Sequence, residues 1–244
     1  MNKGFYNNLE ENFEQAYELS QKKFSHEELL KLLEKGNIPQ KQIAALNFDY
    51  VKTEKDAETL LNNLTGCDGK IREAVALKIN QILSSNIETV KIFANLGAKK
   101  FADATIDING NICRLAVDSA CILKSDNNFS KEYVKYIIQF TKEALDELDK
   151  FIFRDKKYVI NKQIFKLYWC LEALKYFYEF VCEEELNKIL QKCAEQKEYT
   201  IREKVAQIVN FSGLFQDLRE KLKNDENYYV RAVFKIAPHP APLP

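Results

Sequence analysis

Glycine and proline are scarce in this chain. It has 244 residues but only seven glycines and five prolines, and four of the prolines fall within residues 238–244. Both residue types interrupt helices, so their scarcity elsewhere favours long helices. A hydrophobic content of 46% is enough to form a substantial core. The sequence therefore predicts a folded, all-α protein.

A long apolar run is also missing. The most apolar stretch, residues 164–182, is interrupted by charged residues at roughly helical spacing. That pattern is typical of a buried helix with one polar stripe and not of a membrane span. The N-terminus carries several glutamates and no apolar core of a signal peptide. These absences predict a cytoplasmic protein that is not attached to a membrane.

Recognisable catalytic and metal-binding patterns are absent as well. The six cysteines include no C-x-x-C pair, and two histidines are too few for the usual zinc patterns. Reduced, mostly buried thiols are expected. No phosphate-binding loop, dinucleotide fingerprint, nucleophile elbow or H-E-x-x-H motif occurs. The sequence thus predicts no catalytic residues, no metal and no cofactor.

There is no excess charge of either sign. Lysine plus arginine equals aspartate plus glutamate at 36 each. A neutral chain has no overall field that would attract a polyanion, which argues against nucleic acid as a partner.

The chain does contain a recurring phrase, in which an apolar residue is followed by a basic one and then by a run of Ala, Val or Ile. The clearest copies are 71–77, 201–206 and 230–234, and looser ones lie at 41–46 and 113–117. The basic residues of the five copies are Lys41, Arg72, Arg114, Arg202 and Arg231. The intervals between them are 31, 42, 88 and 29 residues, and the gap of 88 has room for one degenerate copy near Lys166. Repetition at such a period indicates stacked structural repeats.

Apolar periodicity and helix-start signals divide the chain into six helix pairs. Capping boxes are expected at Ser25, Thr53, Ser85 and Thr200. The predicted pairs are 26–35 with 39–51, 54–64 with 69–84, 86–96 with 111–123, 130–150 with 161–181, 184–196 with 200–211, and 214–223 with 227–236.

Regions outside these pairs have their own predictions. Residues 99–111 are expected to form an inter-helix loop or a short extra turn, and Gly36, Gly66 and Gly97 to close or follow first helices in a left-handed conformation. The predicted organisation is an N-terminal capping helix in 1–25, a repeat array in 26–237 and a disordered proline-rich tail in 238–244.

The phrase resembles HEAT repeats, in particular the bacterial HEAT-like type. In that type an acidic residue precedes Val-Arg or Ile-Arg and an Ala-rich run, as in 68–72 and 225–231, with 198–202 similar. The resemblance covers about residues 26–237 and implies an α-solenoid of five to six helical hairpins wound into a right-handed superhelix. It also implies a scaffold that binds protein or peptide through a concave surface formed by the second helices.

The charged residues of the phrase allow two interpretations. One is a basic track that binds phosphates or acidic peptides. The other, favoured because partly buried charge requires a partner, is an internal ladder that ties one unit to the next. The ladder residues are Asp68, Arg72, Arg114, Arg202, Asp225 and Arg231. On this interpretation, Arg72→Ala destabilises the fold and does not remove binding.

The helix around 165–180 carries many aromatic residues. Most are expected to fill the core of an enlarged middle unit. Trp169 and Tyr176 are predicted exceptions because they lie closest to the polar stripe that contains Lys166, so these three residues are the candidate binding residues.

The functional alternatives are a non-enzymatic protein-binding scaffold and an enzyme built on a HEAT-like solenoid. Relatives of the second kind are DNA alkylation-repair glycosylases and phycobilin lyases. The short last pair also predicts an apolar C-terminal end face that could join two copies into a homo-oligomer.

Overall fold

The computed structural model describes residues 14–15, 17–150 and 157–235. Within them the regular structure is entirely helical, as the sequence predicts. Most of the predicted N-terminal capping helix and all of the proline-rich tail lie outside these ranges.

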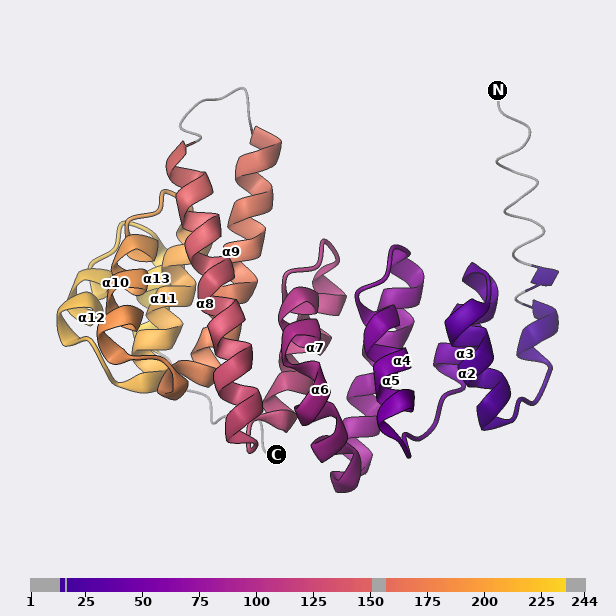
Figure 1. Cartoon of the computed structure of the whole chain (residues 1–244). Coiled ribbons are helices and arrows are strands. Elements are labelled where there is room, and N and C mark those ends of the chain that lie inside the picture. The colour runs from indigo at the N-terminus through magenta and orange to yellow at the C-terminus, as the bar shows by residue number, and fades with distance from the viewer. Residues whose placement is uncertain (1–13, 16, 151–156, 236–244) are drawn as a thin grey trace, which may run out of the picture.

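The helices follow one another in pairs (Figure 1). They are α2 (His26–Lys35) with α3 (Ile38–Leu46), α4 (Glu54–Leu64) with α5 (Gly69–Ser85), α6 (Ile87–Thr105) with α7 (Gly110–Leu123), α8 (Asn127–Lys150) with α9 (Lys157–Phe177), α10 (Glu183–Ala194) with α11 (Tyr199–Ser212), and α12 (Gln216–Lys223) with α13 (Tyr228–Ala232). Short 3₁₀ turns, Tyr178–Phe180 and Val233–Lys235, follow α9 and α13.

Two of the four expected capping boxes are present. Ser25 caps α2 with Glu28, and Thr53 caps α4 with Asp56. The other two predictions are wrong by one or two residues, because α6 begins after Asn86 and α11 after Glu198. Asn86 accepts a backbone N–H itself, so Ser85 ends the preceding helix instead of starting the next.

The expected break after Gly97 is also wrong. α6 continues to Thr105 because Phe101, Ala104 and Thr105 are buried at spacings of three and four, which keeps one helical face in the core. A Cβ on Gly97 would lie 2.7 Å from a ring carbon of Phe101, so this glycine makes room for the ring. Among the described glycines only Gly213, at the end of α11, has a positive φ.

The helices stack in two layers along the row. The first helices α2, α4, α6, α8 and α10 form one, here called the first-helix layer; the second helices α3, α5, α7, α9, α11 and α13 form the other, the second-helix layer. Buried side chains from both layers join into one continuous core. Packing is loosest between α8 and α10 and between α7 and α9. The long pair α8 and α9 extends beyond its neighbours (Figure 1).

The first helix of the last pair, α12, has a polar outer surface. α12 buries Leu218 and Leu222, and exposes Asp217, Glu220 and Lys221. With only two apolar residues, one turn apart, the helix has a single narrow apolar stripe, which is used against α11 and α13. The expected apolar end face is therefore not found on this helix.

None of the helices in the described ranges combines the length and the apolar character that crossing a membrane requires.

Candidate functional site

One position recurs in the second helices, four residues after the N-cap. It is called the rung position here and is occupied by Lys41, Arg72, Cys113, Arg202 and Arg231. A side chain one turn into a helix leans back toward the N-terminus. Four of the five rung side chains reach the loop that precedes their own helix, whereas Lys41 donates to Asn63 on α4 at 3.2 Å.

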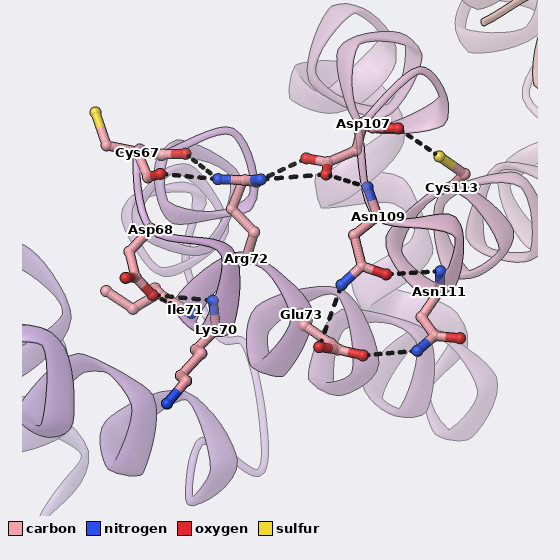
Figure 2. Close-up of polar contacts among 11 residues, drawn as sticks. Cys67, Asp68, Lys70, Ile71, Arg72, Glu73, Asp107, Asn109, Asn111 and Cys113 are labelled. Carbon is pink, nitrogen blue, oxygen red and sulfur yellow. Dashed lines mark hydrogen bonds and ion pairs between the residues drawn. The ribbon is translucent and has the colours of Figure 1, made fainter. Parts of the chain in front are cut away.

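Arg72 shows what the rung position does (Figure 2). Its Nη1 donates to the carbonyls of Gly66 and Cys67, both at 3.0 Å. Its Nε and Nη2 donate to the carboxylate of Asp107, in the next helix pair, at 2.6 and 3.2 Å. The Asp107 hydrogen bond raises the pKa of Arg72. One guanidinium thus fixes its own loop and holds the next unit.

Arg202 repeats this arrangement. Its Nη1 donates to the carbonyls of Gln196 and Lys197, both at 2.9 Å. Its Nε and Nη2 donate to Asp225 of the following pair at 2.7 and 3.0 Å. The hydrogen bond from Arg202 holds the pKa of Asp225 below its usual range. Asp225 is therefore the ionised partner of a buried cation at neutral pH.

The acceptor loops are also alike. Asp107 accepts the backbone N–H of Asn109 at 2.9 Å, and Asp225 accepts that of Asn227 at 2.8 Å. In each case the asparagine is the N-cap of the second helix. An Asp-x-Asn sequence therefore both starts a helix and presents a carboxylate to the preceding unit.

A second contact supports the Arg72 rung. Glu73 accepts from the side-chain amides of Asn109 at 3.3 Å and Asn111 at 2.9 Å (Figure 2). Adjacent residues on α5 therefore hold both the loop and the first turn of α7.

Two predicted ladder residues do not occupy the expected places. Arg114 is exposed and forms no ion pair with a described residue. The rung position of α7 is occupied by Cys113 instead, and the Cys113 thiol donates to the carbonyl of Asp107 at 3.0 Å. Asp68 caps α5 by accepting from the backbone of Lys70 and Ile71 and pairs with no arginine of another unit. A cysteine is too short to bridge two units, so it makes only the contact within its own loop.

The three predicted binding residues on α9 point to three different neighbours. Lys166 lies 3.0 Å from Glu143 on α8. Trp169 lies over Gly110 at the start of α7, where a Cβ would be 3.8 Å from the indole. Tyr176 packs edge-on against Phe211 of α11, with ring centroids 6.3 Å apart. They do not form a single patch.

Between α9 and α11 lies a half-buried charge cluster. Glu172 accepts from Lys204 at 2.5 Å and from Lys175 at 3.4 Å. Burial disfavours the ionised carboxylate, but the two ammonium groups outweigh burial and lower the pKa of Glu172. Lys204 also lies over the ring of Tyr168, 4.5 Å from its centroid. Lys175 and Lys204 share the one carboxylate of Glu172, and the contact with Lys204 ties α9 to α11.

The surface is hollowed on the first-helix layer, between α8 and α10. Two adjoining cavities, each of about 550 Å³, share Lys142, Asp146, Cys182 and Glu185 in their walls. The Lys142–Glu185 ion pair, at 2.5 Å, spans them. This hollow is called the α8/α10 groove. Sequence reasoning missed it, because only the loose packing of α8 on α10 creates it.

The walls of the α8/α10 groove are amphipathic. Its apolar part comes from both helices and the segment between Phe180 and Cys182, and its rims carry charges of both signs. The apolar lining residues are Val134, Ile138, Leu145, Phe180, Val181 and Ile189. The charged rim includes Lys131, Lys188 and Lys192, which form no ion pair across the groove.

No group of three metal-ligating side chains is assembled within the residues that the structure describes. All six cysteines are free thiols; Cys113, Cys170 and Cys193 are buried, whereas Cys67 and Cys182 are exposed. Burial raises the pKa of Cys113 to about 12, so this thiol stays protonated at neutral pH.

No protein-family model matches this chain, and no curated protein matches its sequence. Similar solved structures include two crystal structures of engineered proteins from the Northeast Structural Genomics Consortium. One is 14% identical with a TM-score of 0.46 and covers 87% of this chain and 94% of its own. The other is 15% identical with a TM-score of 0.43 and covers 87% and 96%. Similarity at this level carries no argument about function.

Proposed function

We propose that the chain is a non-enzymatic, HEAT-like α-solenoid with a right-handed superhelix, and that it binds segments of other proteins. Six helix pairs stacked in two layers support the architecture. The repeated rung contacts support it further, because they join neighbouring units through equivalent residues. Solenoids of this kind offer extended surfaces for recognition.

The α8/α10 groove is the observation that carries the binding proposal. Its lining on α8 runs from Lys131 to Asp146, about 22 Å along the helix axis. That length suits several residues of a polypeptide better than one small molecule. An apolar floor between charged rims favours an amphipathic helix or strand, whose apolar side chains would contact the floor.

The second-helix layer is the binding surface that the HEAT resemblance implies. There Arg114 and Asp118 on α7 form no ion pair with a described residue, and Phe165 on α9 is 37% exposed. These groups are available to a partner, whereas the carboxylate of Glu172 already accepts hydrogen bonds from Lys204 and Lys175. The groove is favoured because it combines an apolar floor with charged rims along much of α8.

Charge-reversal variants distinguish the two surfaces. Lys188→Glu changes the rim of the groove, and Arg114→Glu changes the second-helix layer; both side chains are exposed, so both variants should fold. Partners captured by the wild-type protein are identified, and their affinity for each variant is measured. Loss with Lys188→Glu and retention with Arg114→Glu support the groove; the reverse result moves binding to the second-helix layer.

The enzymatic alternative has its own outcome in the same experiment. If no protein is captured and duplex DNA binds with an affinity that falls steeply with salt, the scaffold proposal is wrong and a glycosylase-like function takes its place.

A further inference from the structure

The charges along the α8/α10 groove are unevenly distributed. At one end, Lys131 and Lys135 lie on the second and third turns of α8, and both side chains are exposed. The other lining residues of this part of α8 carry no charge; they are Val134, Ile138 and Gln139. The end of the groove near the start of α8 is therefore lined by positive charge alone.

The rest of the groove carries both signs. The carboxylates in its lining are Glu143, Asp146, Glu184 and Glu185. Lys142 contacts Glu185 at 2.5 Å, which marks where the first turn of α10 faces α8. Lys188 and Lys192 lie further along α10. Lys131 is about 17 Å from Lys142 along the helix axis, so the positive end is well separated from the carboxylates.

The walls of the groove favour a helix over a strand as its occupant. α8 and α10 are helices, so their backbone groups are hydrogen-bonded within them. In the segment that leads into α10, the N–H of Val181 donates to the carbonyl of Tyr178 at 3.1 Å. A strand would find few backbone partners here and would leave its own polar groups unpaired. A helix satisfies its backbone internally and needs only an apolar face.

We infer that the α8/α10 groove binds an amphipathic helix of another protein that carries acidic residues at one end. The apolar face of that helix contacts Ile138 and Ile189, one from each wall. Its acidic end contacts Lys131 and Lys135. The groove runs about 22 Å along α8, which corresponds to about 15 residues of a bound helix. This inference rests on the proposed function and narrows the class of partner.

The test uses the full chain and a set of capped peptides of about 16 residues that form amphipathic helices with Leu, Ile or Phe on the apolar face. Each is made in an acid-ended form, with glutamates at one end, and in a base-ended form with lysines in their place. Methyl NMR follows the isoleucine signals while peptide is added. Saturable shifts are expected at Ile138 and Ile189 in the groove, and none at Ile108, which is 79% exposed before α7.

The charge assignment is tested by the two peptide forms and by charge reversal. At low salt, acid-ended peptides should bind at least about fivefold more tightly than base-ended ones, since each exposed ion pair contributes modestly. Lys131→Glu combined with Lys135→Glu should reverse this preference, and both positions are exposed, so the variant should fold. Lys31→Glu, at an exposed position of α2, should leave the preference intact.

Four results would overturn the inference. Equal affinity for the two charge forms would reject the acidic end, and unchanged affinity after prolines are placed in the middle of the peptide would reject a helix. Shifts at Ile108 as large as those at Ile138 would mean non-specific adsorption. No shift with any peptide of the set would reject the helix class altogether. If Lys188→Glu still weakens a captured partner in that last case, the groove remains the binding surface for a segment of another kind.

Discussion

Replacing Arg72 with methionine tests how much the rung contacts stabilise the fold. Methionine keeps most of the apolar stem and removes the guanidinium. Asp107 then loses its bidentate partner, and the carbonyls of Gly66 and Cys67 lose their donors.

The magnitude follows from burial. The Arg72 and Asp107 side chains are only 11% and 9% exposed. Removing one partner of a buried ion pair typically costs about 3–5 kcal/mol. Both residues line a cavity of about 360 Å³ that water can enter, and Asp107 keeps the N–H of Asn109. The lower end of the range, about 3 kcal/mol, is therefore expected.

The assay is urea unfolding followed by far-ultraviolet circular dichroism, with Lys188→Met as the matched control. Lys188 lies 2.6 Å from Glu184, but these side chains are 71% and 76% exposed. A solvent-exposed pair of this kind contributes less than about 1 kcal/mol. The Lys188→Met control therefore measures the free energy lost when a close but solvent-exposed ion pair is removed.

A loss for Arg72→Met no larger than that of the control would refute this reasoning. A double-mutant cycle with Asp107→Asn adds a second criterion. If the two residues act through each other, the double variant is less destabilised than the sum of the single changes. Simple additivity would mean that Arg72 acts through its loop carbonyls alone.

Four further predictions use the same unfolding measurement. Arg114→Ala should change the free energy of unfolding by no more than about 0.5 kcal/mol, because the side chain is exposed and off the rung; a loss near that of Arg72→Met would return it to the ladder. Gly213→Ala should cost about 1 kcal/mol, since its φ is +70° and no atom lies near the added methyl; no loss would mean that the turn tolerates a side chain. Glu172→Gln should cost about 3 kcal/mol because Lys175 and Lys204 lose their counter-charge; a neutral result would contradict the burial argument. Arg202→Met should weaken the acid dependence of stability. The pKa of Asp225 is lowered by Arg202, so this stabilisation is complete above the ordinary aspartate pKa of about 3.9 and is lost as the pH falls through the folded-state pKa. Unfolding midpoints measured from neutral pH into acid should therefore fall less steeply for the variant than for the wild type.

The helix pairs could be predicted from the sequence because their signals are local. Apolar spacing and a scarcity of breakers place most helix ends to within one or two turns, but not the end of α6. The end of α6 is mispredicted at Gly97, because in the sequence a glycine that makes room for Phe101 cannot be told apart from one that ends a helix. Only the contact across the core separates these two roles.

The rung residues were partly predictable. The basic side chain of Arg114 favours it as the rung residue of α7, but the spacing of four from the N-cap Asn109 places Cys113 there. That spacing is visible in the sequence once the N-cap is known. The acceptor Asp107 lies in a segment expected to be a loop, and nothing local indicates that it faces Arg72, 35 residues earlier. The α8/α10 groove depends on how tightly two helices pack, which no single segment encodes.

Lysine-directed cross-linking of a captured partner, read by mass spectrometry, locates the binding surface on the chain. Cross-links should concentrate on Lys131, Lys188 and Lys192, three of the lysines on the rim of the α8/α10 groove. Cross-links confined to the exposed lysines of the first two helix pairs, such as Lys31 and Lys55, would contradict this prediction.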